Sequence, residues 1–263
     1  MKLLLRIVLV TILLQGCAIK GVMLAPEAKN GQGEIPRTPE KQFLLVGTTY
    51  KGTPQLFTAM ETTFRETNAA DRYIMAMGDN VKAQDSVAMT QQLNPLIELT
   101  KKVDAYPYFL PGNYDWGFDK NNGLEAMEDF LEERMEADDV LTPNNGCPLE
   151  SIEIGDEIQL IIIDSQWYIA DWDHHYKMND KCEIKSREKL MLEVKGEIKK
   201  NANKLIFVAM HHPVFTNGFH AGRFSFRDHV FPLQGRVPVP GVATLINQIR
   251  SQGAVSIQDR FNV

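Results

Sequence analysis

Residues 73–80 read Tyr-Ile-Met-Ala-Met-Gly-Asp-Asn, an apolar run that ends in a Gly-Asp-Asn string. The run has the length of a buried strand, and glycine and asparagine are common where a chain turns out of a strand. Two more strings follow apolar runs in the same way, Gly-Asn-Tyr-Asp at residues 112–115 and His-His-Pro at residues 211–213. Each string alone is more typical of an ordinary turn. Their shared position, where ligands gather in open α/β sheets, favours a functional interpretation.

The surrounding pattern predicts an α/β fold. From Phe43 onward, short apolar runs alternate with segments of helical periodicity, which is typical of strands packed between helices. The expected strands are residues 42–47, 73–77, 106–110, 151–154, 159–163 and 204–210, and the expected helices are residues 55–66, 87–103, 124–135 and 187–199. The length and the composition, with 44% hydrophobic and 24% charged residues, suit one globular domain.

The N-terminal segment has the layout of an export signal, with basic residues before a short apolar stretch at residues 7–14. That stretch is too short to span a bilayer. Residues 14–17, Leu-Gln-Gly-Cys, resemble the lipobox of bacterial lipoproteins, in which Cys17 is acylated. The alternative is an ordinary signal peptide in which Cys17 is incidental. Acylation would anchor the protein in a membrane, and Ala18 after the cysteine is typical of sorting to the outer membrane.

The expected organisation therefore has three parts: a signal peptide at residues 1–17, a flexible tether at residues 18–41 and a single domain at residues 42–263. Cys147 and Cys182 are the other two cysteines. In an exported chain a disulfide between them is favoured over two free thiols. The net charge of −6 argues against a nucleic acid as partner.

The order Gly-Asp-Asn, Gly-Asn-x-Asp, His-x-Pro resembles the calcineurin-like metallophosphoesterases, a superfamily that includes the purple acid phosphatases. Residues 109–116, residues 163–167 and the run from His211 to Pro232 are similar to an envelope-associated bacterial branch of it. The resemblance covers the chain from Phe43 to about Asp259. It implies an α/β sandwich of the calcineurin-like type.

The resemblance also implies a reaction and a set of ligands. In that family two metal ions about 3.5–4 Å apart hold a phosphate ester for in-line attack. By match, Asp79 bridges both ions, while Asn113 and His211 bind the second ion; such ligands suit iron, zinc or manganese. His211 fits the ligand position better than His212, which is expected to be an ordinary loop histidine.

Three departures from the family pattern indicate an impaired site. Thr48 stands where the first ion's own carboxylate would be, and a neutral hydroxyl does not replace that charge. Tyr114 stands where the family has a histidine; a phenol donates a hydrogen bond but is a poor proton shuttle near neutral pH, and a lost acid costs about 10²–10⁴ in rate. Asp115, which supports that histidine in the family, is expected to bond Tyr114 or to cap the following turn.

The third departure is a missing Gly-His-x-His string, which would supply one more ligand to each ion. Either the gene product is truncated, with the last strands of the domain lacking, or its lineage has lost these ligands. We therefore expect at most one weakly bound ion. Two functions stay open: a metal-dependent hydrolase of phosphate esters whose activity is weak or lost, and a non-catalytic envelope lipoprotein that uses the old phosphoesterase surface for binding or scaffolding.

Other polar groups carry less information. The run Asp171-Trp-Asp-His-His175 is more typical of a charged surface loop than of a metal site. His220 and Arg223 lie downstream of His211 and are candidates for phosphate contact, although an exposed loop arginine is the ordinary interpretation. Asp164 either faces the site or caps a turn.

Overall fold

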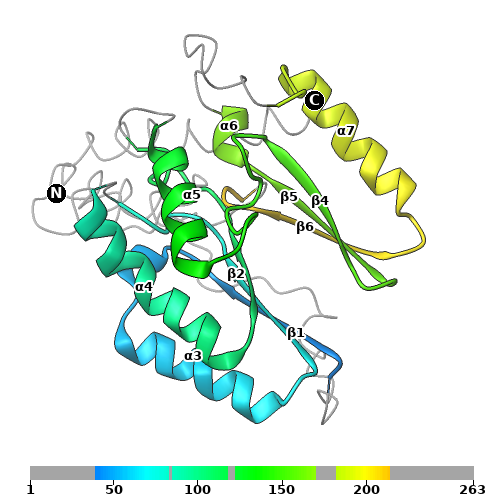
Figure 1. The fold of residues 1–263 in the computed structure, drawn as a ribbon. Coiled ribbons are helices and arrows are strands. Elements are labelled where there is room, and N and C mark those ends of the chain that lie inside the picture. Colours follow the sequence, from blue (N-terminus) through cyan, green and yellow to red (C-terminus); the bar gives the residue numbers. More distant parts are fainter. Residues whose placement is uncertain (1–38, 83–84, 118–121, 170–181, 214–263) are drawn as a thin grey trace, which may run out of the picture. The chain divides into compact units, whose positions relative to one another are not determined.

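The computed structural model describes residues 39–82, 85–117, 122–169 and 182–213 (Figure 1). All of these except Pro213 belong to one unit of the chain, which spans Pro36–His212. Nearly all of the expected signal peptide and tether, including Cys17, lies outside the described residues, as do residues 171–175, His220 and Arg223.

The first sheet has three parallel strands in the order β1-β2-β3. They are β1 (Lys41–Val46), β2 (Asp71–Ala76) and β3 (Tyr106–Phe109). Helix α3 (Pro54–Thr67) connects the first two strands, and α4 (Ser86–Val103) connects the second and third. Because the strands are parallel, their carboxyl ends meet at one edge, where Val46 pairs with Ala76 and Ala76 with Phe109.

The second sheet has the order β4-β5-β6. Strands β4 (Leu149–Ile154) and β5 (Ile158–Ile163) form an antiparallel hairpin, and β6 (Leu205–Met210) pairs with β5 in parallel. The short helix α6 (Ser165–Ile169) follows β5, and α7 (Arg187–Lys200) precedes β6. Helix α5 (Asn122–Met135) lies between the two sheets in the sequence and contacts α4.

Helices α3, α4 and α7 each begin directly after a residue whose side chain caps the helix. Thr53 accepts a hydrogen bond from Leu56 N and precedes Pro54 at the first helical position of α3. Asp85 caps α4 through Ala88 N, and Ser186 caps α7 through Lys189 N. A side-chain oxygen at this position satisfies one of the backbone N–H groups that a helix start leaves unpaired.

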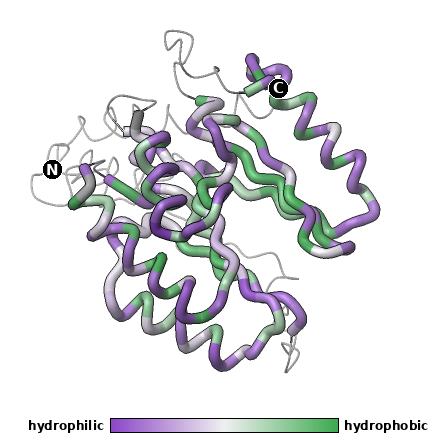
Figure 2. The backbone as a smooth tube through the Cα atoms, viewed as in Figure 1, coloured by the Kyte–Doolittle hydropathy of each residue, from purple (hydrophilic) through white to green (hydrophobic). Residues whose placement is uncertain are grey.

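The two faces of the first sheet have different neighbours. Ile74 and Ala76 of β2 belong to a core cluster with buried residues of α3, α4 and α5. Tyr73 and Met75, which alternate with them, belong to a second cluster that includes Leu160 and other residues of the second sheet. Figure 2 shows the apolar colour concentrated on the strands and the polar colour on much of the helices. The first sheet is therefore covered by helices on one face and by the second sheet on the other.

The sequence predicted this α/β class and every named strand of the described part. The four expected helices correspond to α3, α4, α5 and α7, and no helix end differs by more than two residues. The short α6 and the 3-10 turn η1 (Thr49–Lys51) were not expected. Cys147 and Cys182 are joined in a disulfide, with their Cα atoms 5.2 Å apart. Within the described residues, no helix is long and apolar enough to cross a membrane.

Candidate metal centre

Four loops meet beyond the carboxyl ends of the parallel strands. Thr48 N, after β1, donates to Gly78 O at 3.1 Å, so the first two loops are joined directly. Leu110 N, after β3, donates to Ala76 O at 2.8 Å. The residue after β6, His211, donates to the loop after β2, as described below. The strings singled out in the sequence therefore lie side by side, as expected for strand ends at one edge of a sheet.

Asp115 holds these loops together from inside. Its side chain is fully buried and accepts backbone hydrogen bonds from Asn80 N and Val81 N, both at 2.7 Å, and from Gly112 N at 2.8 Å. Burial raises the pKa of Asp115 to about 7, and the backbone donors limit that rise. Asp115 thus fixes the loops on which the site residues stand.

Asn80 is a second buried residue whose side chain joins the loops by hydrogen bonds. Its side-chain amide donates to Leu110 O at 2.7 Å and to the Asp115 carboxylate at 3.3 Å, and its oxygen accepts from the Thr49 hydroxyl at 2.9 Å. It is fully buried. One amide side chain therefore connects the loops after β1, β2 and β3, which the sequence alone did not indicate.

Two glycines allow the loops to approach. A Cβ atom on Gly112 would lie 2.3 Å from Asp79 N, and one on Gly78 would lie 2.4 Å from the His211 ring. Gly78 also has a φ of +93°, which disfavours any residue with a side chain. The next residue, Asp79, has a φ of +56°, an uncommon conformation for a residue other than glycine. Strained backbone of this kind clusters at functional sites.

The three expected metal ligands come together on this frame. His211 Nε2 lies 3.3 Å from Asn113 Oδ1 and 3.6 Å from Asp79 Oδ1. The same Asp79 oxygen accepts a hydrogen bond from Tyr114 N at 3.0 Å. These residues are 34 or more positions apart in the sequence, since they follow β2, β3 and β6. We refer to Asp79, Asn113 and His211 as the ligand trio.

The orientation of the His211 ring is set by its other nitrogen. Nδ1 lies 2.8 Å from Met77 O, and because a carbonyl can only accept, Nδ1 carries the proton. In the neutral ring Nε2 then holds a lone pair directed toward two oxygens that are themselves acceptors. At 3.3 Å from Asn113 Oδ1 and 3.6 Å from Asp79 Oδ1, this nitrogen is placed where a shared proton or a cation would stabilise the arrangement. A backbone carbonyl on Nδ1 is also the usual outer contact of a metal-binding histidine.

The donor set of the trio suits a borderline metal ion. One carboxylate, one amide oxygen and one imidazole nitrogen are ligands accepted by zinc, iron and manganese. Within the described part of the chain, no group of three or more His, Cys, Asp and Glu side chains could hold a metal ion. The trio contains only two residues of those types, because its third member is an asparagine. Its single negative charge is small for a tight site.

Thr48 and Tyr114, whose residue types indicated an impaired site, both lie near the trio. Thr48 has a φ of +57°, a strained conformation for a β-branched residue, and lies beside the Asp79 loop through its bond to Gly78. The Tyr114 side chain is 40% exposed, and its ring packs edge-on against the Tyr50 ring with the centroids 5.5 Å apart. The structure thus has a neutral hydroxyl at position 48 and a phenol at position 114 beside the trio.

His212 and Asp164 have structural partners. The Ser165 hydroxyl lies 2.9 Å from His212 Nδ1 and accepts from His212 N at 3.0 Å. Asp164 accepts from Trp167 N at the start of α6 and from the Trp116 indole, both at 3.0 Å. Burial raises the pKa of Asp164 to about 7. The interpretation of His212 as a satisfied loop residue agrees with these contacts, and Asp164 caps the turn.

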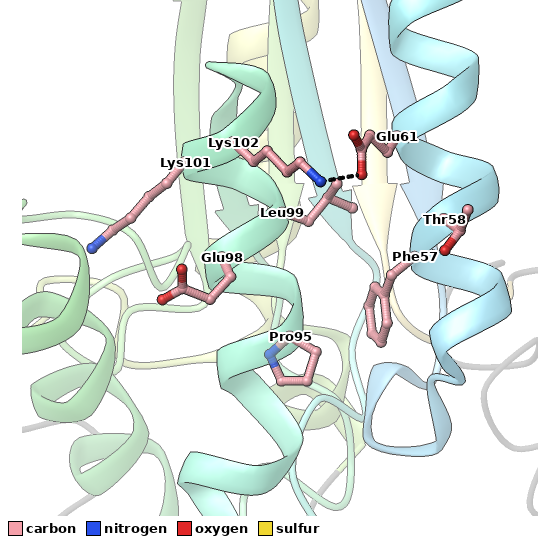
Figure 3. Close-up of a pocket in the computed structure, with 8 residues that line it drawn as sticks. All are labelled: Phe57, Thr58, Glu61, Pro95, Glu98, Leu99, Lys101 and Lys102. Atoms are coloured by element: carbon pink, nitrogen blue, oxygen red, sulfur yellow. Dashed lines mark hydrogen bonds and ion pairs between the residues drawn. The ribbon is translucent and has the colours of Figure 1, made fainter.

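A groove between α3 and α4 is separate from the trio in its residues. Figure 3 shows it, with Phe57, Pro95 and Leu99 as its apolar lining and an ion pair of 2.7 Å between Lys102 Nζ and the Glu61 carboxylate across it. It shares no residue with the ligand trio. It lies on the helical side of the first sheet, and nothing in its lining resembles the chemistry at the strand ends.

Comparison of the chain with family models, with curated proteins and with solved structures gives no significant match. A function is therefore indicated by the geometry of the strand-end loops and by the resemblance of their sequence strings.

Proposed function

We propose that this chain is a member of the calcineurin-like metallophosphoesterases, with the corresponding sandwich fold, and that its ancestral reaction is metal-dependent hydrolysis of phosphate esters. The observation that carries the proposal is the convergence of His211 Nε2 on Asn113 Oδ1 and Asp79 Oδ1 at 3.3 and 3.6 Å. These are the residues that the resemblance selects as ligands. The activity of this chain is weak or lost.

A bound iron, zinc or manganese ion would supply Lewis-acid polarisation of the phosphate ester. Asp79 would contribute a negatively charged carboxylate oxygen, and Asn113 would contribute an amide oxygen. His211 would contribute Nε2, since its Nδ1 proton is held by Met77 O. Tyr114, anchored through its backbone N–H to Asp79, presents a phenol that can donate a hydrogen bond to a substrate oxygen. The trio holds at most one ion, and loosely.

The low activity follows from two residues. Thr48 offers no charge to a second ion, and Tyr114 offers a phenol, which is a poor proton donor near neutral pH. Loss of a positioned acid costs about 10²–10⁴ in rate. These same two residues favour the alternative function, a non-catalytic envelope protein that keeps the fold for binding or scaffolding.

The proposed setting is the cell envelope. Acylation of Cys17 would hold the domain to the membrane, with the outer membrane favoured by Ala18. The disulfide between Cys147 and Cys182 is compatible with an oxidising compartment. A phosphate ester is the expected ligand, and no nucleic acid is expected.

The experiment is elemental analysis of the purified full chain together with an aryl phosphate assay, on the wild type, D79N and D138N. D138N removes the same charge at an exposed residue of another loop. Bound metal and slow turnover that D79N abolishes and D138N leaves intact would support a reduced hydrolase. Bound metal without turnover would support the non-catalytic alternative. A folded protein that binds no metal in any of the three forms would overturn the metal-centred proposal.

A further inference from the structure

Two tyrosines beside the ligand trio are both anchored to Asp79. Tyr50 N donates to Asp79 O at 3.4 Å, and Tyr114 N donates to Asp79 Oδ1 at 3.0 Å. Their rings meet edge-on with centroids 5.5 Å apart. The aromatic pair is therefore fixed next to the carboxylate on which the trio depends, although its two members come from the loops after β1 and β3.

Two lysines gather over this pair. Lys82 Nζ lies 5.7 Å from the Tyr114 ring centroid and 6.0 Å from that of Tyr50, and Lys51 Nζ lies 5.2 Å from the Tyr50 centroid. These distances suit attraction between an ammonium and an aromatic face. The backbone of Lys82 is held by a hydrogen bond of 2.7 Å from its N to Gln92 Oε1. We refer to Lys51, Lys82, Tyr50 and Tyr114 as the cationic rim.

The rim is positively charged in an acidic chain. A side-chain hydrogen bond to Tyr50 raises the pKa of Lys51, and Asp79 and Tyr114 act in the same direction, so its amine is charged at neutral pH. The chain as a whole has a net charge of −6. Thr48, which stands just before η1, adds no carboxylate that would neutralise the rim. Two ammonium groups thus adjoin a site whose trio has only one negative charge.

We propose that the cationic rim is a phosphate-binding subsite, and that it makes the site selective for phosphate monoesters over diesters. This rests on the proposed phosphoesterase function, since it names the substrate class for the same site. A monoester dianion carries twice the charge of a diester monoanion, so it gains more from two nearby ammonium groups. Tyr114, which is 40% exposed, offers an aromatic ring for the alcohol part of the ester, and a phenol hydroxyl can donate to a phosphate oxygen.

The test measures binding rather than turnover. Phenyl phosphate and methyl phenyl phosphate are titrated calorimetrically into the full chain at low salt, with and without added zinc. The variants are K51Q/K82Q and the matched control K195Q/K199Q, which removes two charges from exposed positions on α7. Melting temperatures of both double variants check that the fold is retained. The expected result is that the wild type and the control bind the monoester about tenfold more tightly than the diester, and that K51Q/K82Q loses most of this preference.

Equal binding of the two esters by the wild type, or an equal loss in both double variants, would overturn the inference. The zinc arm separates this failure from a failure of the proposed function. If zinc does not bind but the monoester preference persists in the metal-free chain, the metal-centred proposal fails while the anion subsite holds. If zinc binds and the lysine substitutions change nothing, the subsite fails while the metal centre holds.

Discussion

Asp115 and Asp79 are carboxylates in the same loop cluster, but they serve different purposes. Asp115 is fully buried, and its oxygens receive backbone N–H groups from Asn80, Val81 and Gly112. Asp79 receives one backbone N–H, from Tyr114, and the same oxygen faces the His211 ring. Asp115 is committed to holding the loops, whereas Asp79 has acceptor capacity directed toward other ligands. Of the two carboxylates, Asp79 is therefore the one equipped to bind a cation.

The largest expected effect is on stability, from D115N. Either orientation of the new amide places an N–H donor against backbone donors that now bond to oxygen. At pH 8, where Asp115 is ionised, we expect a loss of about 3 kcal/mol in the free energy of unfolding, measured in urea. D79N is the matched substitution: Asn is tolerated at positive φ and still accepts from Tyr114 N, so its cost should stay below about 1 kcal/mol. Equal losses of unfolding free energy in D115N and D79N would contradict the different roles of the two carboxylates.

The next effect concerns the close approach of the loops. G112A would place a methyl group 2.3 Å from Asp79 N, a backbone atom that cannot turn aside. We expect a cost of about 1–3 kcal/mol in urea unfolding, as for other overpacked positions. G47A is the control, because a Cβ on Gly47 has nothing within 4 Å. If G112A is as stable as G47A, the loops at Gly112 and Asp79 do not pack as closely as the structure shows.

The pH dependence of stability follows from the buried carboxyl groups. Burial raises the pKa values of Asp115 and Asp164 to about 7, above their values near 4 in an unfolded chain. The folded state therefore binds these protons more tightly, and its stability should fall as the pH rises from about 4 to 7. Each of the two groups contributes up to about 1.4 kcal/mol per pH unit, so we expect a combined slope of up to about 2.7 kcal/mol per pH unit, measured by urea unfolding at pH 5, 6 and 7. Glu61 and Glu197, whose pKa values are lowered, affect stability mainly below about pH 5, outside the measured range. Stability that rises with pH across it would contradict the assignment.

The smallest expected effect is a gain in cation binding from T48D. A carboxylate at the end of β1, beside the Gly78-Asp79 turn, would add a second negative charge near the ligand trio. We expect zinc affinity to rise about tenfold, which is about 1.4 kcal/mol, by calorimetric titration. T48N is the control, since it also suits the positive φ at this position and adds no charge. If both variants bind zinc alike, position 48 does not face the cation.

Much of the fold could be predicted because its strands are short apolar runs and its helices are long and periodic. The helix α6 has only five residues and η1 has three, too few for periodicity to show. The resemblance of the strings predicts Asp79, Asn113 and His211 as metal ligands, and this stays a prediction. The contact that orients the His211 ring could not be predicted, since the bond from His211 to Met77 O spans 134 positions in the sequence.

The roles of Asn80 and the cationic rim could not be predicted for the same reason. Asn80 reads as a turn residue, yet it connects three loops from a fully buried position. Lys51 and Lys82 belong to none of the strings singled out in the sequence, and only the folded chain brings both over one aromatic pair. Contacts between strand-end loops depend on strand order, which periodicity does not specify.

The most direct test of the ligand trio is anomalous diffraction from crystals of the full chain grown with zinc or manganese, with D79N crystals grown in the same way. We predict one anomalous peak in the wild type, about 2.0–2.3 Å from oxygens of Asp79 and Asn113 and from His211 Nε2, and none at that place in D79N. A wild-type structure without an ion between these three side chains, in crystals that hold the metal elsewhere, would contradict the account.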